Sequence, residues 1–363
     1  MEKGTMKVFG KNYRASWMIE RHGRGIVRVI NQPLLPHRFV IKDLRTHGDT
    51  AEAIRDMTIR GAGTIGAVAA FGLAQGCLEA PDDDRDFWHY VRTVYETLVT
   101  TRPTANDLKH NLDRVMARIE ALPPAKAKRV AVDEARGISD WYAAVGERIA
   151  RNGLKLVKNG ARVLTHCNAG WLALQEWGSA PAPVYLAHRM GRKVFVWVDE
   201  TRPRCQGANL TSWELMQEGV PHAIIPDNAA GFYLRRGEVD VVITGADRIA
   251  ANGDTANKIG TYEKAVLAHE NGVPFYIAAP TSTFDPRCKS GDDIPIEERS
   301  GDEVLFIAGR GDDGKFRRVK IAPAGAVARN PAFDVTPARY ITGIITERGI
   351  VRPTREAIRK LLR

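Results

Sequence analysis

The chain has 363 residues, enough for two domains, and its 44% hydrophobic and 26% charged residues are ordinary for a globular protein. No apolar run approaches the roughly 18 residues that span a bilayer, and the N-terminus lacks an apolar signal segment, so we expect a cytoplasmic protein without a membrane anchor. The net charge of +10 favours anionic partners, but the basic residues form no long run and no nucleic-acid module, so we expect a small anionic molecule and no nucleic acid.

The first part of the chain is dominated by helical patterns. Apolar residues recur at helical spacing in residues 107–122 and 132–149, residues 67–78 are rich in alanine, and residues 51–57 form a shorter mixed segment. Residues 26–30 are expected to be extended. We therefore predict a mainly helical N-terminal domain over residues 1–152.

The second part alternates short apolar runs with helical segments. The runs 162–165, 193–198, 223–225, 239–244 and 274–278 have the length of buried strands. Helical segments lie between them, for example at 210–217 and at 262–270, where Gly272 marks the end of the second. Alternating strands and helices predict an α/β domain over residues 153–363, with a parallel sheet covered by helices on both faces.

Polar and reactive residues follow these predicted strands. They lie at residues 167–170 (CNAG), 199–203 (DETRP), 227–228 (DN) and 245–248 (GADR). Open parallel sheets bind ligands outside the carboxyl ends of their strands, so all these segments should meet at one edge. We predict the functional site at that edge.

A glycine-rich segment lies ahead of the alanine-rich helix. Residues 61–66 (GAGTIG) match the G-x-G-x-x-G pattern of dinucleotide sites. The context does not fit, because residues 51–60 before it are helical in pattern and residues 80–84 (APDDD), where a ribose-binding acid should end a strand, form a loop. Two interpretations stay open: the turn and Arg60 bind a phosphate at a helix N-terminus, or the glycines let helices pack closely.

Cys167 ends the first predicted strand of the second part. Most free cysteines are buried small hydrophobes, but a strand-end position before a turn of free N–H groups favours a reactive thiol. The neighbouring His166 should point to the opposite face of the strand, so we do not expect it to act as a base for Cys167.

Asp247 is a second candidate at a strand end. It is followed by residues 251–261 (ANGDTANKIGT), a polar, glycine-punctuated segment with one lysine, which suits an anion site better than a structural cap. Asp199 and Glu200 have no accompanying histidine, so pairing with Arg202 or capping is favoured over metal binding. The four cysteines form no C-x-x-C pair, which argues against structural zinc and against disulfides.

Several motifs, in the right order, resemble the methylthioribose-1-phosphate isomerase family. Its superfamily includes ribose-1,5-bisphosphate isomerases and the regulatory subunits of the eukaryotic initiation factor 2B exchange complex. The match runs from about residue 15 to near the C-terminus and rests on residues 56–72 (DMTIRGAGTIGAVAAFG), 101–106 (TRPTAN), 165–170 (THCNAG), 199–214 (DETRPRCQGANLTSWE), 245–262 (GADRIAANGDTANKIGTY), 294–299 (IPIEER) and 330–336 (NPAFDVT).

The resemblance implies a homodimer with a Rossmann-like C-terminal domain and an active site between the two domains. The implied reaction converts 5-methylthioribose 1-phosphate to its ketose in methionine salvage, with no metal or other cofactor. The family's catalytic residues fall on Cys167 and Asp247. Its substrate contacts fall on Arg60, Gly61, Ala62, Arg102, Gln206, Asn257 and Lys258.

One position departs from the family pattern. Gly63 stands where the methionine-salvage members commonly carry proline, and in this it resembles the bisphosphate isomerase branch. A ribose-1,5-bisphosphate isomerase or a non-catalytic regulatory homologue is therefore the alternative. Against these, residues 167–170 and 251–262 resemble the methylthioribose type, and the retention of both Cys167 and Asp247 favours catalysis.

Overall fold

The N-terminal part of the chain is organised around one buried helix, α2. The structure is a computed structural model that describes residues 6–102 and 106–363. Helix α2 (Ala62–Glu79) is built largely of alanine and glycine and is buried on nearly all sides. Small side chains let α1, α3, α4 and α5 pack directly against it. These helices are α1 (His47–Arg55), α3 (Asp84–Val99), α4 (Asn106–Ile119) and α5 (Pro124–Gly153).

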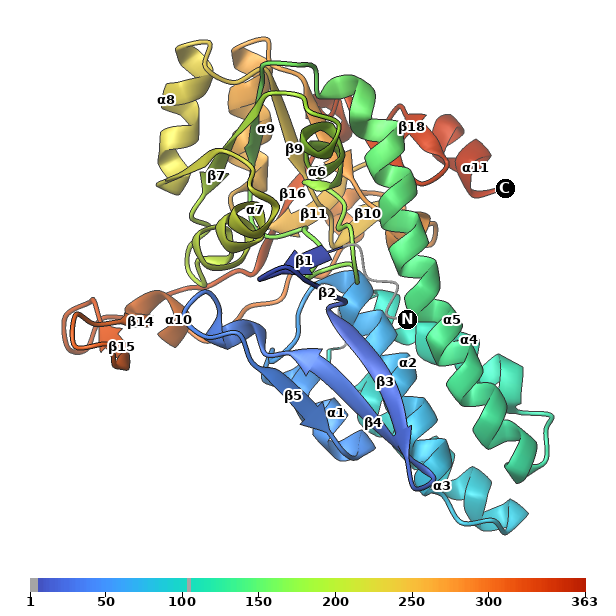
Figure 1. Ribbon diagram of the computed structural model, residues 1–363. Coiled ribbons are helices and arrows are strands. Elements are labelled where there is room, and N and C mark those ends of the chain that lie inside the picture. The colour runs from blue at the N-terminus through green and yellow to red at the C-terminus, as the bar shows by residue number, and fades with distance from the viewer. Residues whose placement is uncertain (1–5, 103–105) are drawn as a thin grey trace.

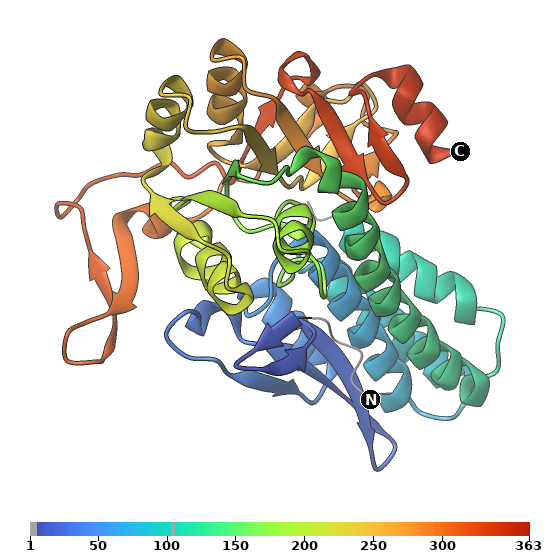
Figure 2. The same cartoon turned by 45° about the horizontal axis from the view of Figure 1, so that its top comes forward.

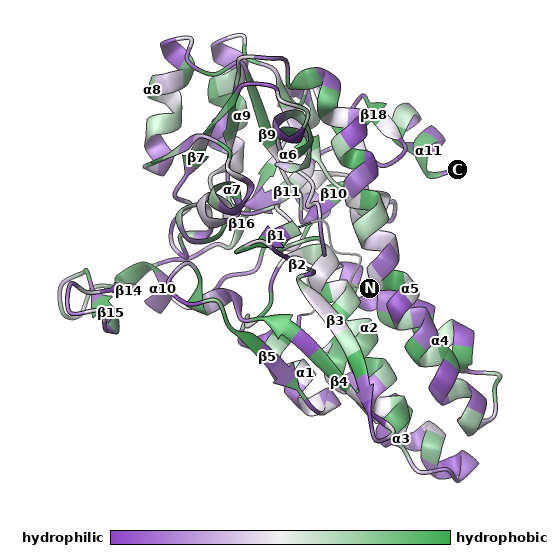
Figure 3. Cartoon of the chain, in the orientation of Figure 1, coloured by the Kyte–Doolittle hydropathy of each residue, from purple (hydrophilic) through white to green (hydrophobic). Residues whose placement is uncertain are grey.

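A small antiparallel sheet covers the remaining face of α2. Its order is β3-β4-β5, and both β3 and β4 contact the helix. Figure 3 shows green and purple bands alternating along α4 and α5, as expected for helices with one buried face. The strands are β3 (Ser16–Arg21), β4 (Arg24–Ile30) and β5 (Ile41–Leu44), preceded by the hairpin β1 (Met6–Val8) and β2 (Lys11–Tyr13).

The C-terminal part contains a seven-stranded sheet in the order β18-β17-β12-β9-β6-β7-β8, in which only β18 runs antiparallel. Counted along the chain from β6, six of these strands follow the order 3-2-1-4-5-6 of dinucleotide-binding Rossmann folds. The order reverses between β6 and β9, where such folds have their crevice. The strands are β6 (Ala161–Thr165), β7 (Val194–Asp199), β8 (His222–Ile225), β9 (Val241–Thr244), β12 (Phe275–Ala278), β17 (Gly343–Thr346) and β18 (Gly349–Val351).

Both faces of this sheet are covered. Val163 belongs to a core that continues into the N-terminal helices, whereas the next residue, Leu164, belongs to a separate core beneath α8 and α9. One continuous apolar core therefore joins the N-terminal helices to one face of the sheet. The covering helices are α6 (Ala182–Arg189), α7 (Ser212–Glu218), α8 (Ala230–Arg235) and α9 (Thr261–Glu270).

A four-stranded sheet, in the order β13-β10-β11-β16, lies beside the carboxyl ends of the main strands (Figure 1). Its strands are β10 (Arg248–Ala250), β11 (Thr255–Lys258), β13 (Phe284–Asp285) and β16 (Phe333–Thr336). A hairpin projects away from the body in both views (Figures 1 and 2). It follows α10 (Asp302–Leu305) and consists of β14 (Phe306–Arg310) and β15 (Phe316–Lys320), and α11 (Arg355–Leu362) ends the chain.

The mixed α/β fold predicted from sequence is confirmed, with the sheet strands within a few residues of their predicted positions. The sequence analysis missed α3, β17 and the three-stranded N-terminal sheet, of which residues 26–30 form one part. The division of the chain into two domains at residue 152 stays a prediction. Helix α5 ends at Gly153, next to that boundary, and it packs against β17 of the C-terminal sheet. In the described ranges, no helix combines the length and apolarity needed to cross a membrane.

Two helical glycines give a matched test of the packing around α2. A methyl group on Gly76 would lie 2.5 Å from Cγ1 of Val94, whereas Gly137 on α5 has no such neighbour within 4 Å. We expect Gly76→Ala to lower the free energy of unfolding by about 1–3 kcal/mol through overpacking. Gly137→Ala should raise it by about 0.5–1 kcal/mol, since alanine is the better helix former. Urea unfolding measures both, and equal effects would contradict this packing.

Candidate functional site

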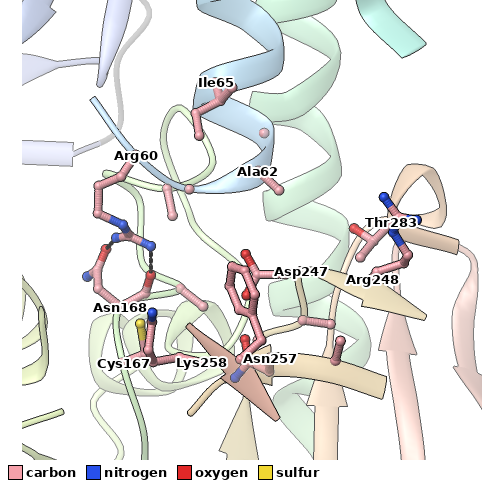
Figure 4. A pocket seen from close by; sticks show the side chains of 18 of the residues that line it. Arg60, Ala62, Ile65, Cys167, Asn168, Asp247, Arg248, Asn257, Lys258 and Thr283 are labelled. Atoms are coloured by element: carbon pink, nitrogen blue, oxygen red, sulfur yellow. Dashed lines mark hydrogen bonds between the residues drawn. The ribbon is translucent and has the colours of Figure 1, made fainter. Parts of the chain in front are cut away.

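One cavity collects all the site residues predicted from sequence. It lies where β6 and β9 end, facing the start of α2 and strand β11 (Figure 4). This is the point at which the strand order reverses. The predicted residues that line it are Arg60, Gly61, Ala62, Arg102, Cys167, Gln206, Asp247, Asn257 and Lys258.

Cys167 is held in an unusual backbone conformation. Its φ of 65° lies in the left-handed region, which costs energy for a residue with a side chain. Two threonine hydroxyls stabilise this turn: the backbone N–H of Cys167 donates to Thr201 Oγ1 at 2.8 Å, and Thr211 Oγ1 donates to its carbonyl at 2.6 Å. The strand-end turn therefore aims a buried thiol into the cavity.

Asn168 links the turn after Cys167 to the N-terminal part. The guanidinium of Arg60 donates to both the side-chain and the backbone oxygen of Asn168 (Figure 4). The amide of Asn168 in turn donates to Glu214 Oε1 at 2.8 Å. Glu214 is fully buried, and this burial raises its pKa to about 7. Arg60 is thus fixed by a chain of contacts that begins at Glu214 on α7 in the C-terminal part.

The close packing of the glycine-rich turn, one of the two interpretations left open by the sequence, is confirmed, whereas phosphate binding stays a prediction. Gly61 has a φ of 89°, and a Cβ there would lie 2.4 Å from the backbone of Ala173, so close packing requires glycine. A Cβ on Gly63 would lie 2.3 Å from Cδ1 of Leu174 and 2.9 Å from Cδ1 of Tyr142, so a side chain there would require both neighbours to shift. Within the described ranges no hydrogen bond occupies the N–H groups of Ala62 and Gly63, which begin α2 beside the cavity. They suit an anion.

Asp247 follows β9 and faces the cavity. Burial raises the pKa of its carboxyl group above the ordinary value, and the charges of Lys258, Arg60 and two further arginines oppose that rise. Its backbone N–H donates to the carbonyl of Ala256 at 2.9 Å, which fixes it against β11. Asp247 is therefore a carboxyl group poised to hold a proton near a cluster of cations.

Lys258 reaches the cavity from the end of β11. Its ammonium donates to the carbonyl of Ala332 at 2.7 Å and lies 5.0 Å above the ring of Phe333. Burial lowers the pKa of Lys258 to about 8, and the nearby charge of Arg299 lowers it further. The neighbouring Asn257 donates to Thr261 Oγ1 at 3.0 Å.

Arg299 is the cavity residue that sequence reasoning missed. It belongs to residues 294–299 (IPIEER), which carried the family resemblance without an assigned role. Its guanidinium lies 3.1 Å from Glu297, and Arg102 shares that carboxylate at 3.7 Å. Burial and the charge of Arg299 lower the pKa of Arg102. Two arginines therefore compete for one carboxylate.

The charges around the cavity do not balance. Arg60, Arg102, Lys258 and Arg299 all act on Asp247, while the opposing carboxylates are Asp247 and Glu297. Arg204 adds no surplus because Glu303 pairs with it at 2.9 Å. The cavity thus carries a surplus of two positive charges when Asp247 is ionised and three when Asp247 holds its proton, and either surplus suits a phosphate monoester dianion. The side-chain oxygen Oε1 of Gln206 is also buried without a partner, and Gln206 lines the same cavity.

The expectation about Asp199 was wrong in one respect. No histidine accompanies it in sequence, but the fold brings Nδ1 of His166 to 2.9 Å from its carboxylate. Arg202 binds a different acid, Asp227, through its backbone N–H at 2.7 Å. His166, Asp199 and Asp227 place their donor atoms within 4.8 Å of one another and form a group that could hold a metal ion. Lys264 already lies 3.5 Å from Asp199, which supplies a positive charge there.

The dinucleotide interpretation finds no support in the fold. The G-x-G-x-x-G segment follows α1 instead of a strand, and residues 80–83 connect α2 to α3. Residues 103–105 of the TRPTAN motif lie outside the described residues, whereas Arg102 itself lines the cavity.

Comparisons with known proteins agree with this geometry. The profile of the Initiation factor 2 subunit family matches residues 58–353. A methylthioribose-1-phosphate isomerase of Gluconobacter oxydans is 49% identical over 95% of this chain and 95% of that protein. A crystal structure of 5-methylthioribose 1-phosphate isomerase from Pyrococcus horikoshii OT3 gives a TM-score of 0.85 at 43% identity, covering 97% of this chain and 96% of that one. The translation initiation factor eIF-2B, subunit delta, from A. fulgidus gives 0.82 at 34% identity, covering 97% and 99%.

Lys258 predicts how anion binding depends on pH. Because its pKa is lowered to about 8, the free protein loses this positive charge as the pH rises through that value. Inorganic phosphate is already a dianion there, so its affinity should fall by up to roughly tenfold per pH unit above pH 8. Lys258→Arg should remove the dependence, because a guanidinium stays charged. Calorimetric titrations between pH 7.5 and about 9.5 measure this, and a pH-independent affinity in the wild type would contradict the role of Lys258.

Proposed function

Because the chain belongs to the Initiation factor 2 subunit family, and within it to the methylthioribose-1-phosphate isomerases, we propose that it converts 5-methylthioribose 1-phosphate into 5-methylthioribulose 1-phosphate, a step of methionine salvage. The observation that carries the proposal is the cavity itself. Cys167 and Asp247, the two residues that carry the family's catalytic positions, face one space whose surplus positive charge suits a sugar phosphate.

We assign the phosphate to the cations and free N–H groups around the start of α2. Arg60, the Gly61–Ala62 turn, Arg102 and Lys258 surround it, and Gln206 and Asn257 supply neutral polar contacts. The dianion then offsets the surplus charge, which makes binding favourable in a buried place. Arg299 joins this set because it shares Glu297 with Arg102.

The chemistry follows from the phosphate at C1, which locks the anomeric carbon so that no free aldehyde is present. The ring oxygen must gain a proton as the C1–O bond opens, and a hydrogen must move from C2 to C1. Asp247 supplies the acid, because burial raises the pKa of its carboxyl group and so keeps it protonated to higher pH. In an enolate route Cys167 acts as the base: it accepts the C2 proton and returns it to C1, while O2 loses its proton to the Asp247 carboxylate that donated to the ring oxygen. If a hydride moves from C2 to C1 instead, Cys167 stabilises the transition state.

The wall of the cavity suits an uncharged group at C5. Apolar side chains line it beside the phosphate cations, and Arg248, the remaining cation there, lies 3.4 Å from Asp285. Gly63 has a packing reason of its own, since Leu174 fills the space beside it. These features favour a methylthio or methyl group over a second phosphate. The apolar residues are Met57, Ile65, Leu174, Ile294, Pro295 and Phe333.

Four further expectations, drawn from the sequence and from the family resemblance, belong to this proposal. The chain acts as a homodimer in the cytoplasm, its residues 1–152 and 153–363 form two domains, and turnover needs neither a metal ion nor a dinucleotide.

Replacement of either catalytic candidate should strongly lower the turnover rate while leaving the fold intact. We expect Cys167→Ala and Asp247→Asn each to lower kcat by about 10²–10⁴-fold, the usual loss when one general acid or base is removed. Cys288→Ala and Asp240→Asn are matched controls, because neither residue lines the cavity. Steady-state rates and circular dichroism of the four variants measure this. A near-normal kcat in either cavity variant would remove its catalytic assignment.

A panel of substrates tests the group at C5. An apolar pocket distinguishes a missing methylthio group by only about 1–3 kcal/mol, so 5-deoxyribose 1-phosphate should react within roughly a few hundred-fold of the methylthio compound. Ribose 1,5-bisphosphate should be poor, because its second phosphate would be buried without cations. The measurement is kcat/KM for all three in one buffer. Preference for the bisphosphate would overturn the assignment and give Gly63 the meaning it has in the bisphosphate branch.

A further inference from the structure

His166 is a buried titratable group that the proposed chemistry does not use. It directly follows β6 and precedes Cys167, and its side chain is completely buried, as is that of Asp199. Its two ring nitrogens have separate partners: Nε2 lies 2.8 Å from the carbonyl oxygen of Ile259, and Nδ1 lies 2.9 Å from Oδ2 of Asp199. Ile259 directly follows Lys258, so the ring connects the two segments that carry Cys167 and Lys258.

The partners determine where the protons lie. A carbonyl oxygen only accepts hydrogen bonds, so Nε2 carries a proton. Nδ1 faces a carboxyl group, and the two can bind only if a second proton lies between them. His166 and Asp199 therefore hold two protons together. The other oxygen of Asp199, Oδ1, is buried and has no hydrogen-bond partner among the described residues. The hydrogen bond that compensates the burial of this carboxyl group is therefore the one from His166 to Oδ2.

Charged groups surround the ring and Asp199 from several elements. Asp199 faces the ring from β7, and Lys264 of α9 lies 3.5 Å from its carboxylate. Asp227 acts on Asp199, Asp334 of β16 lies near the ring, and Glu263 of α9 lies near Asp334. These acids outnumber the single lysine.

We propose that His166, sharing its proton with Asp199, is a positioning residue that fixes the Cys167 turn against the Asn257–Lys258 segment. The strained turn at Cys167 depends on Asp199 in a second way, because Thr201 Oγ1, which accepts the Cys167 N–H, donates to the Asp199 carbonyl at 3.0 Å. Gly260 completes the contact. Its φ of 100° turns the chain after Ile259, and a Cβ there would lie 3.0 Å from the histidine ring. The inference rests on the proposed function only in naming Cys167 and Lys258 as parts of the site.

Two substitutions separate the bonds of His166. In His166→Gln the amide nitrogen can take the place of Nε2 and keep the contact with Ile259. In His166→Asn the shorter amide can reach Asp199 but loses Ile259. We expect His166→Asn to weaken inorganic phosphate binding and to lower kcat/KM by roughly 10²-fold, and His166→Gln to retain more of both. His222→Gln is the matched control, since both nitrogens of that half-buried ring are also bound, away from the cavity.

Nitrogen-15 NMR of histidine-labelled enzyme gives a second readout. His166, identified in the wild type by the absence of its signals in the His166→Gln spectrum, should show a protonated Nε2 and a strongly downfield Nδ1 proton. The proposal is overturned by an unprotonated Nε2, by wild-type phosphate affinity and turnover in His166→Asn, or by a stoichiometric metal ion that the substitution removes. Absent isomerase activity in a wild-type enzyme with the expected NMR signals would overturn the proposed function alone.

Discussion

The buried carboxyl group of Glu214 is the contact on which the geometry of the site depends. It accepts hydrogen bonds from Asn168 at 2.8 Å, from the backbone of Trp171 at 2.9 Å and from Tyr185 at 2.7 Å. These bonds give the irregular turn after β6 one shape, although no strand or helix satisfies its polar groups. Asn168 in turn accepts two hydrogen bonds from Arg60, which connect the start of α2 to the turn after β6. A carboxyl group that does not itself line the cavity thereby helps to set the distance between the anion site and the thiol.

Burial shifts the pKa values of two groups in this cavity in opposite directions. It raises the pKa of Asp247 and lowers that of Lys258, so the acid tends to hold its proton while the lysine tends to lose one. The surrounding arginines stay charged in either case: they oppose the rise in the pKa of Asp247, and Arg299 adds to the fall in the pKa of Lys258. One desolvated cavity can therefore contain a proton donor and a strong anion site together. Water would screen the attraction between them and return both groups to ordinary behaviour.

The strand order explains why these groups meet. The strand order reverses between the neighbouring parallel strands β6 and β9, so the segments that follow these strands lead away to opposite sides of the sheet. This leaves a crevice between them that side chains from other elements can enter. Cys167 and Asp247 occupy the two strand ends, while β11 and the start of α2 close the crevice. The left-handed backbone at Cys167 is tolerated because threonine hydroxyls bind both sides of its peptide.

The sequence by itself determined most of the α/β elements and the edge of the sheet at which the site lies, because hydrophobic period and strand-end chemistry are local properties of the chain. Motifs in order also named nine of the residues that line the cavity. The sequence did not place Arg299, whose role comes from a segment packed against β16, nor the contact of His166 with Asp199, 33 residues apart. It left Gly63 open, since only the position of Leu174 shows why a side chain is absent there. Each of these depends on distances between segments remote along the chain, which the packing of the folded core alone decides.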